Sequence, residues 1–297
     1  MDIQDTTKVP TGLSLYTMAA QRAAREVIYS YSTSFGLATR LLGKNFQGHV
    51  ENIYALVRVA DEIVDGSAAQ ARELSKQVDP EQLLAEFEAE TYRAMDTGYS
   101  TNLIIHAFAQ TARAVGIAKD IVEPFFYSMR QDLTEKEHDQ ASFEKYVYGS
   151  AEVVGLMCLQ VFMSENKYTD DEKIRLTKGA RALGSAFQKV NFLRDLAADF
   201  KRLGRSYFPS VDVNNFNEET KQRLVADIDK DLRLSAESLP LLPSSARRAV
   251  AAAQLLFTQL NRQISKTSAQ ELINRRISVG APQKLALLIK AVIGVKV

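Results

Sequence analysis

The sequence predicts an all-α protein of 297 residues. Strong helix formers fill most segments, and the two-residue alternation typical of half-buried strands is rare. Proline and glycine are few, at 7 and 14 residues, so loop-rich and fibrous architectures are excluded. No linker rich in Pro, Gly or Ser and no internal repeat divides the chain. We therefore expect a single domain over residues 1–297, with residues 1–13 as a flexible N-terminus.

Successive segments carry apolar residues at helical spacing, and each is bounded by a residue that starts or ends helices. Gly43, Gly66 and Gly116 mark helix ends, and Pro80 marks a helix start. Pro124 falls inside a helical pattern, so it should kink that helix or occupy its first turn. Residues 67–79 are the most loop-like internal segment. The predicted helices cover residues 14–30, 33–43, 46–64, 80–96, 101–115, 118–132, 141–164, 170–203, 218–237, 244–265 and 282–293.

Composition excludes several classes of protein. Hydrophobic residues make up 46% and charged residues 25%, which is the balance of a globular chain. A net charge of +1 gives no support for nucleic-acid binding, and the single cysteine, Cys158, excludes an internal disulfide framework. Residues 1–12 lack a signal-peptide pattern, and no apolar run reaches about 18 residues. We expect a cytoplasmic protein, with any membrane contact peripheral.

The helix predicted at 46–64 is apolar nearly all round, which indicates burial, yet it carries a row of polar residues. Asp61 and Asp65 lie four residues apart and share one face. Arg58 lies one turn before Asp61, and Tyr54 one turn before Arg58. We call these four residues the first acidic seam. Burying such like charges costs several kcal/mol unless a partner compensates, as an order of magnitude.

The helix predicted at 170–203 repeats this arrangement near its end. Gln188, Asn191, Asp195 and Asp199 follow a three-four-four spacing, so all four point the same way. Arg194 stands beside Asp195. We call the four residues the second acidic seam.

Two carboxylates on one helix face usually belong to the solvated surface, but two apolar helices that each carry such a pair beside an arginine are hard to explain in that way. If the seams face each other, their oxygen atoms suit a hard cation such as Mg²⁺, which keeps coordination positions for phosphate oxygens. The flanking arginines can grip a diphosphate. The sequence therefore predicts metal-assisted ionisation of a diphosphate ester.

The motifs that contain these residues resemble those of the squalene/phytoene synthase family, most of all its bacterial, especially actinobacterial, members. The resemblance covers about residues 20–290 and rests on five motifs. They are Y-S-T-S-F at 31–35, Y-x-x-x-R-x-x-D-E-I-V-D at 54–65, Y-x-Y-G-S-A-E-V-V-G-L-M at 146–157, Q-x-x-N-x-x-R-D-x-x-x-D at 188–199 and G-R-S-Y-F-P at 204–209.

This resemblance implies the isoprenoid synthase fold, a class I terpenoid synthase-like helical bundle with a central cavity. It implies a prenyltransferase that condenses two geranylgeranyl diphosphates head to head, through prephytoene diphosphate, to phytoene with release of diphosphate, the first committed step of carotenoid biosynthesis. Mg²⁺ or Mn²⁺ is the implied cofactor, and NADPH is not expected. The implied metal ligands are Asp61, Asp65, Asn191, Asp195 and Asp199; the implied diphosphate contacts are Ser32, Ser34, Tyr54, Arg58, Gln188 and Arg194; and Tyr146, Tyr207 and Phe35 would line the reacting region.

Two other functions stay open at this point. A sister activity would make a C30 product, dehydrosqualene or squalene, from farnesyl diphosphate, and the metal motifs do not separate it from the C40 activity. A non-catalytic helical scaffold is the third hypothesis, against which the intact acid pairs and arginines argue. Oligomeric state and pathway partners are not predicted.

Several residues carry weaker expectations. Thr39 lies one turn beyond Phe35, so its small side chain can leave room for a longer prenyl tail, although packing against a neighbouring helix explains it equally well. Glu152 stands where many relatives have glycine, and its role is open. Asp132 is interpreted as a surface acid, with another acid at the mouth of the site as the alternative. The Glu135–His138 segment is interpreted as a solvated connection. The small residues at 149–151 and 155 fit close helix packing as well as substrate room.

Overall fold

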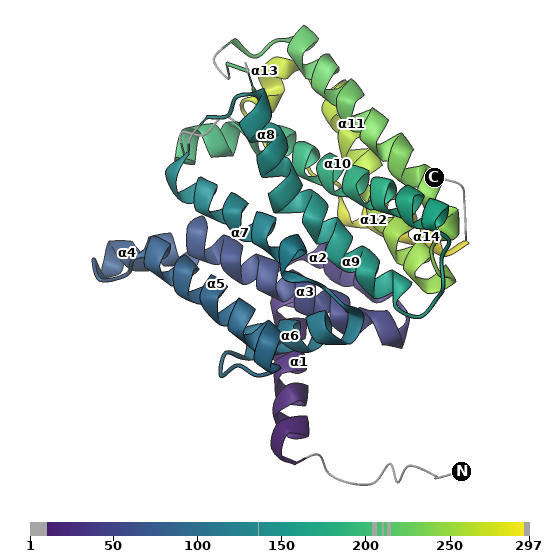
Figure 1. The fold of residues 1–297 in the computed structure, drawn as a ribbon. Coiled ribbons are helices and arrows are strands. Elements are labelled where there is room, and N and C mark those ends of the chain that lie inside the picture. The colour runs from purple at the N-terminus through teal and green to yellow at the C-terminus, as the bar shows by residue number, and fades with distance from the viewer. Residues whose placement is uncertain (1–10, 136, 204–206, 210, 213–214, 294–297) are drawn as a thin grey trace.

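The computed structural model describes residues 11–135, 137–203, 207–209, 211–212 and 215–293, apart from the side chains of residues 33–34 and 197–203. Throughout this described part the elements are helices, and no strand is present, which confirms the all-α prediction (Figure 1). The expected flexible N-terminus falls largely outside the description, but residues 12 and 13 are already helical because α1 begins at Gly12.

The N-terminal half forms a layer of packed helices. It comprises α1 (Gly12–Tyr31), α2 (Thr33–Thr39), α3 (Lys44–Val64), α4 (Ser67–Leu74), α5 (Pro80–Thr97), α6 (Leu103–Val115) and α7 (Lys119–Thr134). Helix α2 is shorter than predicted, because it ends at Thr39 and the chain then turns. Gly43 is the residue that precedes α3. The loop predicted at 67–79 was wrong in its first part, where good helix formers build α4 and bury Ala68.

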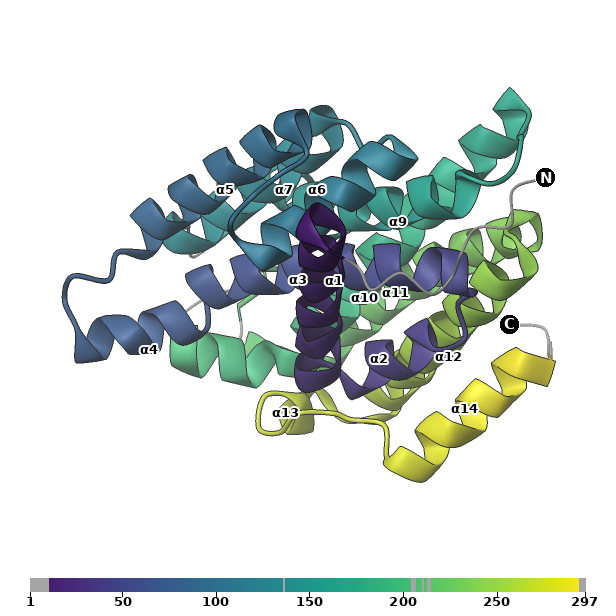
Figure 2. The ribbon, with the colours of Figure 1, turned by 90° about the horizontal axis from the view of Figure 1, so that it is seen from below.

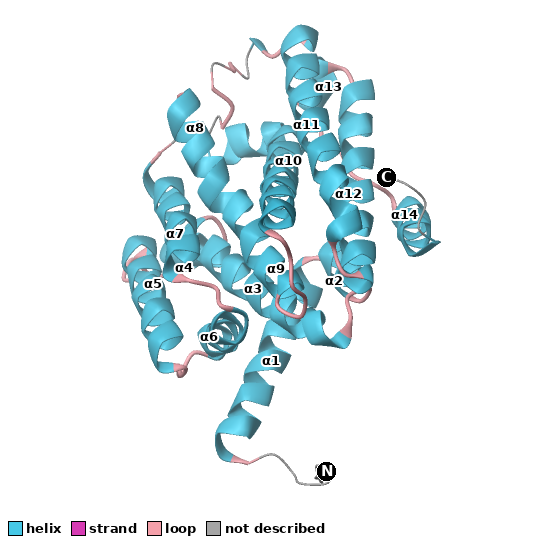
Figure 3. Ribbon diagram, turned by 45° about the vertical axis from the view of Figure 1, so that its right-hand side comes forward, coloured by secondary structure: helices cyan, strands magenta, loops and turns pink. Residues whose placement is uncertain are grey.

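The C-terminal half contains the longest helices. It comprises α8 (Gln140–Val147), a π-helix (Tyr148–Glu152), α9 (Val153–Met163), α10 (Asp170–Leu203), α11 (Glu218–Ser238), a 3₁₀ turn (Leu239–Leu241), α12 (Ser244–Lys266), α13 (Ala269–Leu272) and α14 (Ala281–Ile293). The helix predicted at 141–164 is thus interrupted by a π-helix, and the short α13 was not predicted. Figure 3 shows α10 between α9 and the α11–α12 pair.

The apolar core has two main clusters, and each contains one of the two helices that carry an acidic seam. One cluster takes its buried side chains mainly from α3, α5, α6, α7 and α9. The other takes them from α8, α10, α11 and α12. Helix α3 carries the first acidic seam in the first cluster, and α10 carries the second acidic seam in the other. Packing of each helix in its own cluster fixes the position of the seam that it carries.

Glycine permits a close contact between the π-helix and α7. Gly149, in the π-helix, lies directly against α7, where a Cβ atom would overlap the carbonyl oxygen of Pro124 and the hydroxyl of Ser128. Pro124 itself stands in the interior of α7 rather than in its first turn. Close packing therefore accounts for Gly149, one of the two explanations that the sequence left open.

Helices α8 and α9 with the intervening π-helix form a rod over Gln140–Met163. By length and composition alone, it is the one stretch of the described chain that could cross a membrane. Half of its most apolar window is buried inside the protein, and it packs against α3, α7 and α10, as the core helix of a globular bundle does.

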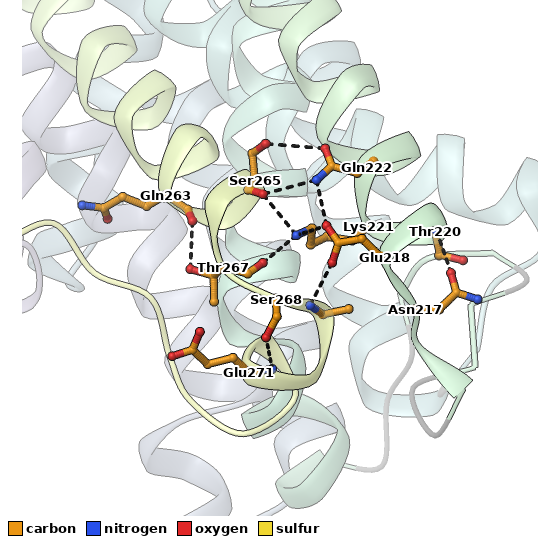
Figure 4. A network of polar contacts seen from close by, with 11 residues as sticks. Asn217, Glu218, Thr220, Lys221, Gln222, Gln263, Ser265, Thr267, Ser268 and Glu271 are labelled. Atoms are coloured by element: carbon orange, nitrogen blue, oxygen red, sulfur yellow. Dashed lines mark hydrogen bonds and ion pairs between the residues drawn. The ribbon is translucent and has the colours of Figure 1, made fainter.

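A buried lysine ties the end of α12 to the start of α11 (Figure 4). Lys221 is 1% exposed, and its Nζ donates to the carbonyl oxygens of Ser265, at 3.1 Å, and Thr267, at 2.5 Å. It also forms an ion pair with Glu218 at 2.5 Å. These contacts satisfy all three ammonium hydrogens and two carbonyl groups at the C-terminal end of α12. The turn that leads to α13 is thereby anchored.

Replacing Lys221 with Met is expected to destabilise the protein by about 2–4 kcal/mol, because buried carbonyl groups and Glu218 lose their partner. The measurement is urea unfolding followed by circular dichroism. Lys230→Met, at an exposed position on the same helix, is the matched control and should change the free energy of unfolding by less than about 0.5 kcal/mol. Equal effects of the two substitutions would contradict the anchoring role.

Candidate active site

The first acidic seam lies on the last three turns of α3. Arg58 forms an ion pair with Glu62 and lies over the ring of Tyr31, 4.3 Å from the centroid to its guanidinium carbon. Glu62 was not predicted as a partner, because it lies beside the seam and not on it. The Nε atom of Arg58 is buried without a hydrogen-bond partner among the described residues. A buried guanidinium N–H of this kind is a donor for an anionic oxygen.

Asp61 is the carboxyl group of the first acidic seam whose pKa is raised most clearly. Burial raises the pKa of Asp61 from 3.8 to about 7; Arg58 opposes this shift, and Asp65 and Glu62 add to it. Asp65 is the residue that follows the last residue of α3. A cation bound between the two carboxylates would remove the repulsion that raises the pKa of Asp61.

The second acidic seam lies on α10, where Gln188, Asn191 and Asp195 are half-buried. Asp195 accepts from two arginines: Arg194, with Nη2 to Oδ2 at 2.5 Å, and Arg276, with Nε to Oδ1 at 2.6 Å. Arg276 comes from the segment between α13 and α14 and was not predicted. The side chain of Asp199 lies outside the described residues.

The described residues of the two seams do not by themselves form a metal site. Among the residues that it describes, no three His, Cys, Asp or Glu side chains are grouped closely enough to hold a metal ion. The donor set nevertheless fits Mg²⁺, because carboxylate and amide oxygens are the ligands that this hard cation prefers. Arginines compensate the negative charge of each seam, Arg58 beside Asp61 and the pair of arginines on Asp195.

Tyr146 lies between the two seams in a buried polar and aromatic cluster. Its hydroxyl donates to both carboxylate oxygens of Asp132 at 2.9 Å. Burial is the main reason why the pKa of Tyr146 is raised well above its usual value; Asp132, Tyr207 and Asp65 add to the shift. The ring of Phe192 stacks on Tyr207 at 4.1 Å and lies 6.1 Å from Tyr146. Asp132 on α7, Tyr146 on α8 and Phe192 on α10 thus belong to one cluster.

Two sequence interpretations in this cluster were wrong. Asp132 was interpreted as a surface acid, but it is buried and accepts from Tyr146. The Glu135–His138 segment was interpreted as a solvated connection, but the His138 side chain is only 3% exposed. Its ring lies 4.9 Å from that of Tyr146 and 6.2 Å from that of Tyr207. His138 lies in a connection between helices, which has no periodicity to reveal a buried side chain. Asp132 lies on α7, and its burial depends on its partner Tyr146 from another helix.

A second group of aromatic rings surrounds Phe35 at the start of α2. Its ring lies about equally far from three others, 6.2 Å from Tyr54, 5.9 Å from Phe187 and 6.0 Å from Phe257. Phe187 and Phe257 stack at 3.7 Å. Together these four rings form an apolar wall beside the first acidic seam. Phe257 was not predicted, because it belongs to a helix without a polar motif.

The two hydroxyl side chains at the ends of α2, Ser32 and Thr39, form hydrogen bonds to its backbone. The Ser32 Oγ accepts from the Phe35 backbone N–H at 3.1 Å and so caps α2. Ser32 also hydrogen-bonds Tyr54. Burial raises the pKa of Tyr54, and this hydrogen bond partly opposes the shift. Thr39 is buried, and its hydroxyl donates to the Gly36 carbonyl at 3.0 Å. The side chain of Ser34 lies outside the described residues.

Glu152 now has a defined partner. Its Oε2 accepts from Arg181 Nε at 2.6 Å, which joins the π-helix to α10. Arg181 also lies over the ring of Tyr148, 5.0 Å from its centroid. Tyr148 thus contacts an exposed arginine, whereas Tyr146 lies in the buried cluster. Glu152 belongs to this ion pair and not to the acidic seams.

Comparisons with known proteins show which family the chain is similar to. A family model described as squalene/phytoene synthase matches residues 28–283. The chain is 26% identical to a phytoene synthase of Arthrospira platensis over 288 residues, or 89% of each protein. It is 23% identical to a phytoene synthase of Mycobacterium tuberculosis over 283 residues, which cover 89% of this chain and 88% of that protein.

Solved structures show the same fold. A crystal structure of a dehydrosqualene synthase matches with a TM-score of 0.75 at 21% identity, covering 93% of this chain and 96% of that chain. The structure of a squalene synthase from Alicyclobacillus acidocaldarius matches with a TM-score of 0.72 at 18% identity, covering 90% and 98%. The order of helices that carries the two acidic seams is therefore that of a known fold.

Proposed function

Because the chain belongs to the squalene/phytoene synthase family, we propose that it condenses two geranylgeranyl diphosphates head to head to phytoene. The observation that carries this proposal is the pair of acidic seams, each on a buried helix and each compensated by arginine. The relatives named phytoene synthase support a C40 product. No part of the chain carries a dinucleotide fingerprint, so we expect a product formed without NADPH.

The chain's own residues account for binding and orientation. Asp61, Asp65, Asn191, Asp195 and Asp199 would hold Mg²⁺ or Mn²⁺, which supplies charge stabilisation for the leaving diphosphate. Arg58 offers its unpaired Nε to a diphosphate oxygen. Arg194 and Arg276 can turn from Asp195 to the diphosphate when that carboxylate takes another partner.

The aromatic side chains would protect and stabilise the carbocations. The stacked Phe192 and Tyr207, with Tyr146 beside them, present ring faces that attract positive charge. The wall formed by Phe35 and its neighbours is apolar and excludes water from the prenyl chain. Each condensation releases two diphosphates and two protons, first in forming the cyclopropyl intermediate and then in opening it.

The test is to incubate the protein with farnesyl or geranylgeranyl diphosphate, each with and without NADPH, and to identify the hydrocarbon by mass. We expect a C40 product from geranylgeranyl diphosphate in equal amount with and without NADPH. A C30 product from farnesyl diphosphate, with no C40 product from geranylgeranyl diphosphate, would favour the second candidate, dehydrosqualene synthesis. A product two hydrogens heavier with NADPH would indicate squalene synthesis instead.

Replacing Arg276 with Gln should lower kcat/KM for the prenyl diphosphate about tenfold or more, because a charge-assisted contact to the diphosphate is lost. Arg275→Gln is the matched control, since Arg275 pairs with Glu271 at the surface. Steady-state kinetics with both variants measure the difference. Equal kcat/KM values for the two variants would show that Arg276 does not contact the substrate.

Replacing Thr39 with Phe should lower the ratio of C40 to C30 product by about tenfold or more. The longer tail carries five more carbons per substrate, each worth about 0.8 kcal/mol when buried, so blocking its path changes selectivity strongly. Thr39→Ser is the control that keeps the space open. Product ratios are compared after circular dichroism shows that both variants are folded. An unchanged ratio in a folded Thr39→Phe protein would remove Thr39 from the tail-binding path.

A further inference from the structure

Helix α14 runs along the outside of the bundle (Figures 2 and 3). One of its faces is apolar and exposed. One face packs against α12 and buries Leu287 and Ala291. The opposite face exposes large side chains four, seven and eight residues apart, the spacing of a single helix face. These are Leu285, 60% exposed, Ile289, 51%, Val292, 51%, and Ile293, 72%. We call these four residues the α14 apolar face.

The charge around this face has one sign. From residue 273 to residue 297 the chain carries five basic residues and no Asp or Glu, whereas the whole chain is nearly balanced. Arg275 and Arg276 are paired with acids, but Lys284 and Lys290 lie on α14 itself. An apolar face beside lysines complements an anionic lipid surface. A two-fold contact between copies would instead bring like charges together.

The position of α14 connects this face to the candidate active site. An apolar slot between α2, α12 and α14 is lined by Phe35, Ala38, Phe257, Leu287 and Leu288, among others. Phe35 and Phe257 also belong to the aromatic wall of the site. Thr39 does not line this slot, whereas its neighbour Ala38 does. The helix also lies almost wholly beyond the matched family region, residues 28–283, so it is not part of what the family model describes.

We propose that α14 docks the protein on an anionic lipid bilayer. The α14 apolar face enters the boundary between headgroups and acyl chains, and Lys284 and Lys290 contact the anionic headgroups. The apolar slot then opens beside lipid, where a long hydrocarbon is soluble. This last consequence rests on the proposed function, but the docking itself does not.

The test is flotation of the purified full chain with vesicles of phosphatidylcholine alone or mixed with phosphatidylglycerol, without substrate. We expect binding to the mixed vesicles. The double variant Leu285→Ser/Ile289→Ser should bind at least about tenfold more weakly, because two large apolar side chains no longer enter the bilayer. The control Leu74→Ser/Ile174→Ser removes the same residue types from exposed positions on α4 and α10 and should bind as the wild type does. Lys290→Gln should weaken binding to the mixed vesicles about fivefold.

Three results would overturn the proposal. The first is that the wild type does not bind mixed vesicles. The second is that the Leu285→Ser/Ile289→Ser variant binds them as strongly as the wild type does. The third is that the wild type forms a dimer and does not bind vesicles, and that the double substitution makes the protein monomeric. Hydrocarbon synthesis in detergent is measured in parallel on the same variants. Because binding is measured without substrate, a failure of docking leaves the synthase activity testable, and a failure of synthesis leaves the docking result unchanged.

Discussion

Asp61→Asn is expected to lower turnover of geranylgeranyl diphosphate by at least about a thousandfold, because the amide lacks the negative charge with which a carboxylate offsets that of a divalent cation. The same variant should be at least as stable as the wild type. Asp61 is a buried carboxyl group whose pKa is raised to about 7, so its charge opposes folding. Loss of activity without loss of stability distinguishes a ligand from a structural residue.

The stability difference should depend on pH in a defined direction. Since the pKa of Asp61 rises from 3.8 to about 7 on folding, the wild type loses stability as the pH rises through that interval. The amide of the Asp61→Asn variant does not titrate, so the advantage of this variant in Tm should grow with pH and level off above about pH 7. Thermal unfolding across this range measures it. Asp171→Asn, at an exposed position of α10, is the control and should leave turnover unchanged.

A variant with near-wild-type turnover at saturating Mg²⁺ would remove Asp61 from the catalytic centre. A variant that is inactive because it is unfolded would be recognised from its lost helical signal, and would contradict the expected gain in stability.

Gly149→Ala is expected to destabilise the fold by about 3–5 kcal/mol, the range of severe overpacking combined with backbone displacement. The added methyl group would overlap the Pro124 carbonyl oxygen and the Ser128 hydroxyl. The Ser128 hydroxyl donates to the Tyr146 carbonyl at 3.1 Å, so the clash also displaces the segment that carries Tyr146. Urea unfolding gives the free energy, and turnover should fall with it.

Gly48→Ala is the matched control, because this glycine also lies inside a helix. Its added methyl group would meet only the flexible side-chain amide of Gln21, at 3.1 Å. Alanine is a better helix former by about 1 kcal/mol, so this variant should be neutral or slightly more stable. If Gly149→Ala proved as stable as Gly48→Ala, the close contact between the π-helix and α7 would not hold in solution.

The features that could be predicted from the sequence are those set by residues near one another along the chain. The first acidic seam is visible because Arg58 and Asp61 interrupt an otherwise apolar helix at helical spacing. The contact between Arg276 and Asp195 could not be predicted, because it joins distant segments and Arg276 lies in no periodic pattern. For the same reason Phe257 stayed hidden beside Phe35.

Local irregularity was also beyond prediction. The π-helix at Tyr148–Glu152 has the same residue pattern as an α-helix, and only the close approach of α7 to Gly149 shows why the helix deviates there. Helix α4 formed in a segment interpreted as a loop because helix propensity and the burial of Ala68 outweigh its polar composition. Asp132 was misplaced because burial of an acid depends on a partner, here Tyr146, from another helix.

The most direct measurement of the central claim is diphosphate release from geranylgeranyl diphosphate by the full chain, with added Mg²⁺ and after treatment with a chelator. If the acidic seams on α3 and α10 hold the cations that assist ionisation, Mg²⁺ should give two diphosphates for each hydrocarbon formed, and the chelator should abolish release. Release that is unaffected by the chelator, or no release with any prenyl diphosphate, would contradict it.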